Sequence, residues 1–390
     1  MKILFVAHTY PRWPGDRAGA QVHRFALEAI ARGHQVRVVA PHAAGAPEGS
    51  EVFEGVEVHR FRYASDQAER IGYQGAVAKS LGFGALAVLP SYLLRFRAAV
   101  NAAEGAFRPE VLSVHWWAPG ALATGGVQAP VAVTCHGSDV RLLGASALIR
   151  LVGRRLLRRV AGVSAVSQVM VDDIRRWGGR GEVALTPMPI DDTRFTAGAT
   201  RRRPPVVLFA GNLIRAKGVD LILRAAAELH RAGVDFVLRL VGDGPDRSAF
   251  EALAAELGIV DVVEWAGPQG HDRMPAEFAA ASIFVLASRG PRGEGMPLTV
   301  VEALLSECAV VATPAGGVPE LVRDEVTGLL ARDEDAAHLA AQLGRVLGDD
   351  ALRLRLGAEG RRAALARHGK GPAMDRFFGF LEGAARGVAR

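Results

Sequence analysis

Cysteine is scarce in this sequence: 390 residues contain two, Cys135 and Cys308. Each lies in an apolar, strand-like run far from the other, so we expect two buried free thiols in a reducing compartment rather than a disulfide or a zinc site. Aromatic residues are also few, at 6%, while 49% of residues are hydrophobic and 23% are charged. This is the composition of an ordinary globular protein.

Long hydrophobic runs are absent as well. The longest apolar stretch, Gly82 to Leu94, is too short to span a bilayer and contains Pro90. Lys2 leads directly into a strand-like segment without a cleavage-site pattern, so no secretory signal is expected. Together these absences predict a cytoplasmic protein.

The Gly-x-Gly-x-x-Gly fingerprint of dinucleotide-binding proteins follows none of the expected strands. This absence argues against a nucleotide-dependent redox enzyme.

The net charge of +6 is concentrated between Met1 and Phe195. This excess favours an anionic partner or a membrane surface, although a general preference for arginine would also explain it, and no nucleic acid is expected as a partner. Within this half, Leu148 to Val160 is an arginine-rich amphipathic pattern. It could lie on an anionic membrane as a peripheral contact at the inner face, or pack its apolar face on its own sheet.

The chain is longer than one hydrophobic core usually supports, so two α/β domains are expected. Short apolar runs alternate with amphipathic helical patterns, which is typical of parallel sheets built from βαβ units. Strands are expected at residues 2–7, 35–40, 56–61, 111–115, 131–135, 162–166, 206–210, 236–241, 262–265, 283–287 and 309–312.

A polar stretch rich in arginine and proline, Thr196 to Pro205, interrupts this alternation and is the expected linker. It separates an N-terminal domain, residues 1–196, from a C-terminal domain, residues 205–371. Doubly wound sheets bind ligands at the carboxyl ends of their strands, so a cleft between two such domains is the expected site.

Two carboxylates, Glu294 and Glu302, stand out in the C-terminal half. The first lies in a Gly/Pro turn, and the second follows an apolar run that looks like a helix start. Helical geometry over the whole interval would point Glu302 back toward the turn, roughly 12 Å along the axis from Glu294. One carboxylate could then reach a sugar hydroxyl and the other the hydroxyl pair of a ribose. A loop residue and a helix-surface charge are the alternative.

The segment Gly211 to Gly218 places Asn212, Arg215 and Lys217 just before a helical pattern. A helix N-terminus with nearby cations suits a diphosphate, because exposed N–H groups and fixed positive charges act together. The spacing is not that of a Walker A loop, and a solvated turn is the alternative.

Polar residues also follow strands of the N-terminal half. His136 and Asp139 come directly after the strand that ends at Cys135, where a histidine could bond a sugar or accept a proton. A capped turn opened by Asp139 is the alternative. His115 ends the neighbouring strand, beside two tryptophans that are more typical of packing. Gly19, before the first helical pattern, would let the backbone approach a phosphate closely.

Taken together, these segments resemble the retaining GT-B glycosyltransferases known as the glycosyl transferases group 1 family (family 4 type). The similarity runs over essentially the whole chain and is densest in the C-terminal half. The segments that carry it are Gly211–Asp220, Val241–Pro245, Glu294–Leu304, Gly316–Glu320 and His136–Asp139.

The resemblance implies a GT-B fold, which is two tandem Rossmann-like α/β domains with doubly wound parallel sheets facing across a cleft. The final helix, about residues 372–390, would pack back on the N-terminal domain. The C-terminal domain would bind a nucleotide-diphosphate sugar, either a UDP- or a GDP-sugar, as co-substrate. The N-terminal domain would bind a saccharide, lipid-linked or small-molecule acceptor, and transfer would retain the anomeric configuration in polysaccharide, glycolipid or glycoconjugate synthesis.

The resemblance also implies roles for single residues. Glu302 would hold the ribose hydroxyls, Glu294 would contact the donor sugar, and Lys217 with Arg215 would bind the diphosphate, which would make a metal cofactor unnecessary. The implied catalytic residues are His136, Lys217 and Glu294. The further donor-binding residues are Gly19, Asn212, Gly242, Gly267, Gly295, Met296, Pro297 and Leu298, while His115 and Asp139 would lie on the acceptor side.

One departure from the family concerns Asn212. The family commonly has arginine at this position, so one cation for the diphosphate is missing, and Arg215 could compensate for it. Two other function classes stay open. A nucleotide-sugar 2-epimerase would share the architecture but use an acid/base pair, and a non-enzymatic binding protein with two α/β lobes would need neither.

Overall fold

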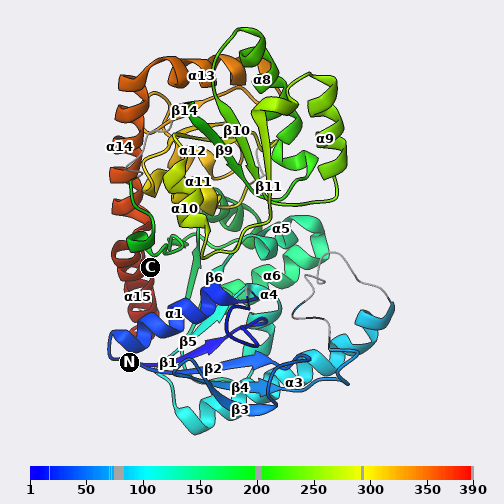
Figure 1. Ribbon diagram of the computed structural model, residues 1–390. Coiled ribbons are helices and arrows are strands. Elements are labelled where there is room, and N and C mark those ends of the chain that lie inside the picture. The colour runs from blue at the N-terminus through cyan, green and yellow to red at the C-terminus, as the bar shows by residue number, and fades with distance from the viewer. Residues whose placement is uncertain are drawn as a thin grey trace. The chain divides into compact units, whose positions relative to one another are not determined.

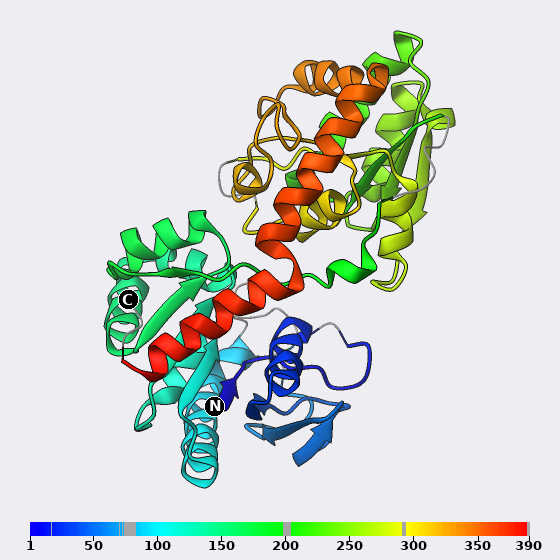
Figure 2. The same ribbon diagram turned by 90° about the vertical axis from the view of Figure 1, so that its left-hand side faces the viewer.

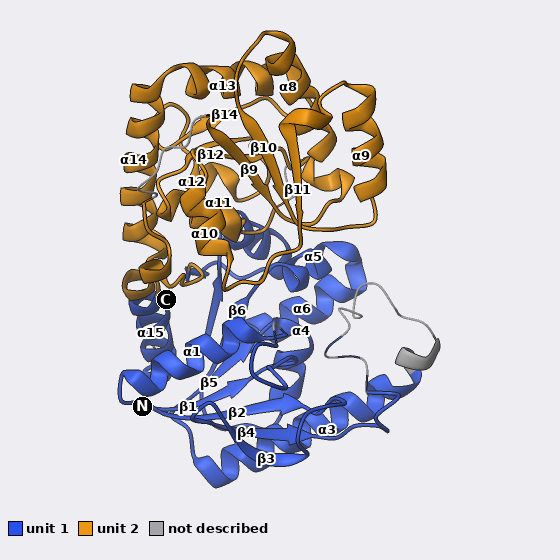
Figure 3. Ribbon diagram, viewed as in Figure 1, with its two compact units in different colours: residues 1–186, 374–390 blue, residues 187–373 orange. Residues whose placement is uncertain are grey.

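The chain forms two compact units, which Figure 3 shows in different colours: unit 1 is residues 1–186 and 374–390, and unit 2 is residues 187–373. The computed structural model describes residues 1–16, 18–69, 71, 73, 83–197, 204–290 and 294–387. The boundary between the two units, at Thr186 and Pro187, comes before the expected linker Thr196–Pro205. The reason is that Ile190 pairs with Gly369 and Phe195 is buried in the core of unit 2. Residues 198–203 of the linker lie outside the described residues.

Unit 1 is built on an eight-stranded sheet in the order β3-β4-β2-β1-β5-β6-β7-β8. Neighbouring strands pair in parallel, except that the polar edge strand β3, which the sequence did not predict, runs antiparallel to β4. Strands β5 and β6 are buried along their whole length, which explains their continuous apolar runs. The strands are β1 (Lys2–Val6), β2 (Gln35–Pro41), β3 (Gly49–Phe53), β4 (Val56–Phe61), β5 (Val111–His115), β6 (Val131–Cys135), β7 (Gly162–Ala165) and β8 (Ala184–Leu185).

The helices of unit 1 connect successive strands of this sheet, as Figure 1 shows. The sequence favours a helix from about Ala76 to Ala106, of which residues 76–82 lie outside the described residues and the rest belongs to α3. The helices are α1 (Ala20–Ala31), α3 (Phe83–Phe107), α4 (Trp117–Gly120), α5 (Ser138–Ala145), α6 (Ala147–Arg159) and α7 (Gln168–Asp173), with the single turns η1 (Ala121–Thr124) and η2 (Ile174–Gly178).

Unit 2 holds a six-stranded, wholly parallel sheet in the order β11-β10-β9-β12-β13-β14. Strands β9, β12 and β13 are buried throughout and form its centre. The strands are β9 (Val206–Ala210), β10 (Val237–Val241), β11 (Val263–Gly267), β12 (Ile283–Leu286), β13 (Ala309–Ala312) and β14 (Leu329–Leu330). The helices are α8 (Val219–Arg231), α9 (Arg247–Glu256), α10 (Met274–Ala280), α11 (Leu298–Leu305), α12 (Val318–Leu321), α13 (Ala336–Gly348) and α14 (Asp350–His368), with the turns η3 (Asp192–Arg194), η4 (Arg215–Lys217) and η5 (Val260–Val262).

The last helix, α15 (Lys370–Ala385), begins in unit 2 and continues in unit 1. Figure 2 shows α14 running along unit 2, in orange, and α15 following it, in red. Within unit 1, Phe377 of α15 packs against Phe25 of α1 with the rings tilted by 35°, and Asp375 accepts a hydrogen bond from Arg32. Among the described residues, no helix has both the length and the apolar character needed to cross a membrane.

Candidate active site

Unit 2 brings its chemistry-bearing loops together at the carboxyl ends of β9, β10, β12 and β13. The loops approach so closely that a side chain would not fit: a Cβ at Gly242 would lie 1.9 Å from the carbonyl oxygen of Gly211, and one at Gly316 would lie 1.7 Å from that of Glu294. Both glycines also have positive φ angles, of 139° and 53°. Glycine is therefore required there by space as well as by conformation.

Glu294 is the centre of this group. Its Oε1 atom accepts bonds from Lys217 Nζ and from Ser288 Oγ, both at 2.5 Å. The glutamate side chain is 8% exposed, whereas that of Lys217 is 25% exposed, so the ammonium lies toward solvent. Ser288 is itself held, because Thr313 donates to its carbonyl oxygen at 2.6 Å. The structure thus brings the predicted residues Lys217 and Glu294 into contact. It adds Ser288, which lies two residues after the end of β12.

The position of Lys217 depends on the turn η4 and on the glycine that follows it. Gly218 has a φ of 67°, and a Cβ there would lie 1.9 Å from the carbonyl oxygen of Ala287. The turn therefore lies directly against the loop after β12. A larger residue at 218 would push the Lys217 ammonium away from Glu294.

Arg289, which sequence reasoning missed, connects the loop after β12 to the turn η4 and the start of α8 by hydrogen bonds and ion pairs. Its guanidinium donates to both carboxylate oxygens of Asp220, at 2.9 and 2.8 Å, and its Nε donates to Glu334 at 2.8 Å. Its side chain also donates to the carbonyl oxygen of Arg215, and its backbone N–H donates to that of Ala216 at 3.0 Å.

Two opposing effects act on the Asp220 carboxyl. Burial works to raise its pKa, but the hydrogen bonds and charge of Arg289 outweigh burial and hold the pKa below its usual value. The ionised pair with Arg289 is thus the favoured state. No motif in the sequence pointed to this fork, since an arginine and an aspartate so far apart in the chain give no local pattern.

Glu302 lies on α11 and is 7% exposed. The helix begins only at Leu298, so the expectation of continuous helical geometry from Glu294 to Glu302 is wrong. Pro297, with a ψ of 93°, is extended and ends the turn before the helix. The separation of roughly 12 Å derived from helical steps therefore does not apply.

The remaining donor-side residues lie on the same loops. Asn212 and the Arg215 side chain are exposed, and the backbone N–H of Arg215 donates to Asp246 at 2.7 Å. Gly242 donates its N–H to the carbonyl of Gly267 at 2.9 Å. Gly295, Met296 and Pro297 form the turn that leads to Leu298, the first residue of α11.

Unit 1 holds a second group, made of histidines, at the carboxyl ends of β1, β5 and β6. The rings of His115 and His136 are joined by a bond of 2.8 Å between Nδ1 of the former and Nε2 of the latter. Trp116 lies against His8 and His136, with ring centroids 4.2 and 4.5 Å away. His115 is wholly buried, so in this structure it contacts His136 and would meet an acceptor only through that ring.

Burial keeps these three imidazoles neutral. Desolvation lowers the pKa of His136 to about 3 and that of His8 to about 4, and it holds the pKa of His115 well below its usual value. In a pair of neutral rings, one nitrogen donates and the other accepts. The tautomer of His115 therefore decides whether His136 offers an N–H or a lone pair at its other nitrogen.

Asp139 stabilises the turn in which His136 lies. Its carboxylate accepts the N–H groups of His136 at 3.1 Å, Gly137 at 3.0 Å and Trp117 at 3.2 Å. Burial raises its pKa, while these bonds oppose the rise. The structure therefore gives Asp139 the capping role that the sequence left open. Gly19, at the start of α1, packs on the backbone of Thr9, where a Cβ would lie 2.3 Å from the carbonyl oxygen.

Two other features lie apart from both groups. In the described part of the chain, His42, Asp66 and Glu69 come within metal-ligand reach of one another. Both ring nitrogens of His42, however, already have partners within the protein, Glu69 at 2.5 Å and the carbonyl of Ala46 at 3.1 Å.

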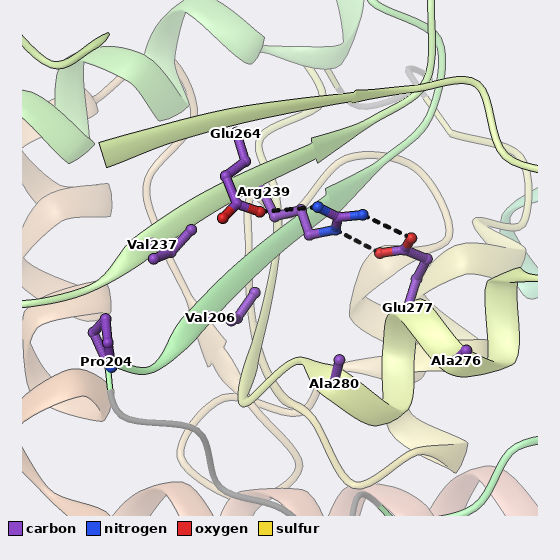
Figure 4. Close-up of a pocket in the computed structure, with 8 residues that line it drawn as sticks. All are labelled: Pro204, Val206, Val237, Arg239, Glu264, Ala276, Glu277 and Ala280. Carbon is purple, nitrogen blue, oxygen red and sulfur yellow. Dashed lines mark hydrogen bonds and ion pairs between the residues drawn. The ribbon is translucent and has the colours of Figure 1, made fainter. Parts of the chain in front are cut away.

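The second feature is a groove of about 590 Å³ in unit 2, shown in Figure 4. It is bordered by the first residues of β9 and β10, by β11 and by α10. Arg239 lies between Glu264 and Glu277 there and donates to both, so its charge is already neutralised. None of the sequence-predicted site residues lines this groove.

Two family models match the chain. The one described as Glycosyl transferases group 1 matches residues 191–363, and the one described as Glycosyl transferase 4-like domain matches residues 16–189. The two matches meet close to the change from unit 1 to unit 2.

Several curated proteins are similar over part of their length. The D-inositol 3-phosphate glycosyltransferase of Acidothermus cellulolyticus is 30% identical over 69% of this chain and 66% of its own. The 2-deoxystreptamine glucosyltransferase of Streptomyces kanamyceticus is 31% identical over 52% of this chain and 56% of its own. The putative colanic acid biosynthesis glycosyltransferase WcaL of Escherichia coli is 28% identical over 61% of both. The chain thus spans 56% to 66% of the length of these relatives.

Solved structures match over nearly the whole chain. Sucrose-phosphate synthase from Thermosynechococcus elongatus aligns with a TM-score of 0.76 and 20% identity over 98% of both chains. HepE from Anabaena, solved in complex with UDP, aligns with a TM-score of 0.74 and 20% identity over 98% of this chain and 100% of its own. At this identity the likeness concerns the fold alone, and the expected GT-B fold class is confirmed.

Proposed function

Since the chain belongs to the glycosyl transferases group 1 family, we propose that it transfers a sugar from a UDP- or GDP-sugar to an acceptor hydroxyl with retention of configuration. The observation that carries this proposal is the bond between Lys217 and Glu294 at the carboxyl ends of the unit 2 strands. It unites a cation suited to a diphosphate with a carboxylate suited to a sugar hydroxyl. The epimerase alternative gains no support from the comparisons.

In this proposal the Lys217 ammonium, with Arg215, neutralises the charge that develops on the leaving diphosphate. An ammonium has three N–H donors, so Lys217 can bind a phosphate oxygen while it keeps its bond to Glu294. Glu294 has a second oxygen for a sugar hydroxyl, and Glu302 would take the ribose hydroxyls. The backbone N–H groups of Gly295, Met296 and Leu298 would add the positive end of α11, whereas Pro297 has no N–H to offer. Side chains and amides would thus take the part that a metal ion plays in other transferases.

The comparisons support particular substrates without fixing them. HepE, which shares this fold, was solved in complex with UDP, so a UDP-sugar is one of the two donors that we propose to test. The relatives named for D-inositol 3-phosphate and for colanic acid biosynthesis favour a small-molecule hydroxyl or a saccharide as the acceptor. For the acceptor we propose a saccharide, lipid-linked or small-molecule hydroxyl. The two buried free thiols, Cys135 and Cys308, favour a cytoplasmic location.

The test is a panel of UDP- and GDP-sugars in which release of free nucleotide and the anomeric configuration of the product are measured. Lys217→Ala should lower kcat about 100-fold or more with a smaller effect on KM, because the additional negative charge on the leaving diphosphate develops in the transition state. Glu294→Gln should lose turnover to a similar extent.

Glu277→Gln is the matched control, since it breaks a comparable ion pair of unit 2 in the separate groove of Figure 4. The proposal fails if no nucleotide sugar is turned over, or if Glu277→Gln loses as much activity as Glu294→Gln.

A further inference from the structure

Helix α6 of unit 1 turns part of its apolar surface outward. Leu148 is 71% exposed, Leu151 47% and Val152 38%. Of the two alternatives that the sequence left open for this helix, packing of the apolar face on its own sheet does not hold for these three residues. The residues that α6 buries are Gly153 and Leu157, which lie on the opposite side of the helix. A Cβ at Gly153 would lie 2.3 Å from Leu143, so α5 fixes which face of α6 points inward.

The arginines of α6 divide into two sets. Arg150, Arg154 and Arg158 donate to backbone carbonyl oxygens, which are those of Leu143 at 3.5 Å, of Trp177 in η2 at 2.9 Å and of Gly179 just after η2 at 3.2 Å. Arg155 and Arg159 are exposed and share the outward face with the leucines. The helix contains no acidic residue. The inner arginines therefore anchor the helix, and the outer ones place positive charge beside exposed apolar side chains.

We propose that this outward face of α6, formed by Leu148, Leu151, Val152, Arg155 and Arg159, docks on an anionic lipid bilayer. The apolar half enters the boundary between headgroups and acyl chains, and the guanidinium groups meet lipid phosphates. Charge complementarity selects this partner: the arginines match anionic headgroups, and the neighbouring leucines would stay in water on a nucleic acid. Figure 1 shows α6 beside α5 at the surface of unit 1.

Vesicle binding tests the proposal without any sugar substrate. The full chain is sedimented with vesicles of phosphatidylcholine alone and of phosphatidylcholine with equimolar phosphatidylglycerol. Binding should require the anionic lipid and weaken as salt is raised. Arg155→Gln with Arg159→Gln should weaken binding roughly 30-fold, because each arginine near the surface contributes about fivefold. Leu148→Ser with Leu151→Ser should weaken it roughly tenfold.

Arg224→Gln with Arg231→Gln is the matched control, because these two arginines are exposed on one helix of unit 2. It should bind like the parent protein, and circular dichroism should show all variants folded. Three results would overturn the proposal: equal binding to neutral vesicles, equal loss in the control, or leucine variants that bind vesicles normally but lose self-association. Vesicle binding and nucleotide release are separate measurements, so either can fail without the other.

Discussion

Units 1 and 2 both gather polar side chains where parallel strands end, yet they treat charge in opposite ways. In unit 2 a partly exposed ammonium pairs with a buried carboxylate, between loops that glycines let approach one another. In unit 1 three histidines pack with a tryptophan, and burial keeps their rings neutral. The difference shows how position controls charge: ion pairs persist where side chains reach solvent, and neutral donors and acceptors remain where aromatic packing removes water.

The largest expected effect comes from filling the contact that positions Lys217. Gly218→Ala should lower the free energy of unfolding of unit 2 by about 4 kcal/mol, because its Cβ would overlap the carbonyl of Ala287. Gly233→Ala is the control, with a similar φ of 74° and no atom within 4 Å, and should cost about 1 kcal/mol. Urea unfolding measures both. Equal losses would mean that backbone conformation, and not the close approach, is what matters.

The second-largest expected effect is a loss of stability of unit 1 at acidic pH. The pKa of His136 is about 3 and that of His8 about 4 in the folded protein, against 6.5 for an ordinary histidine. The unfolded chain takes up protons below about pH 6.5 while the folded chain does not, so unit 1 loses stability as pH falls from 6.5 toward 4. By about pH 5 the loss should be on the order of 1–2 kcal/mol for each histidine.

Tryptophan fluorescence can follow unit 1 alone, because Trp265 is the one tryptophan of the sequence that belongs to unit 2 and Trp265→Phe removes its signal. His136→Asn should flatten the pH dependence in this background. The ion pair of Asp220 in unit 2 should respond only at lower pH. Because the pKa of Asp220 is depressed, its contribution to the stability of unit 2 is lost only as pH falls below about 3.8. A unit 1 that unfolds equally easily at neutral pH and at about pH 5 would contradict the neutral-histidine description.

A smaller effect should come from the bond between the two buried histidines. His115→Phe removes the partner that sets the tautomer of His136 and should lower kcat up to tenfold, with less change in the KM for the nucleotide sugar. His115→Asn can still bond and should recover part of the loss. Nitrogen chemical shifts of His136 report the tautomer directly. If they are unchanged in His115→Phe, His115 only fills space.

Much of the fold followed from periodicity. Strands β4, β5, β6, β9 and β13 have the predicted bounds. The last four are mainly apolar runs, as buried parallel strands are, whereas β4 alternates buried and more exposed residues. The edge strand β3 was missed because Gly49–Phe53 is mostly polar. The change of unit came earlier than predicted, since composition marks a polar stretch but cannot show that Phe195 enters the core of unit 2.

The candidate site was partly predictable. Its acidic and basic residues lie in local patterns, so Lys217 and Glu294 could be named before their contact was known. The fork between Arg289 and Asp220 could not, because it joins residues with no shared motif. For the same reason the sequence left open whether Asp139 binds an acceptor or caps a turn, and only its three backbone bonds favour the second.

The smallest effect should come from restoring the cation that the family resemblance expects at Asn212. This residue is exposed on the loop after β9, so a longer side chain can be accommodated without burial. Asn212→Arg should tighten binding of UDP or GDP about fivefold by adding a bond to the diphosphate, while binding of the bare nucleoside should not change. Asn212→Gln controls for side-chain length, and titration calorimetry measures all three. If affinity rises equally for nucleoside and nucleotide, the new guanidinium does not contact the phosphates. Nucleotide binding by unit 2 would then not depend on a positive charge at position 212 in the way that we propose for Lys217.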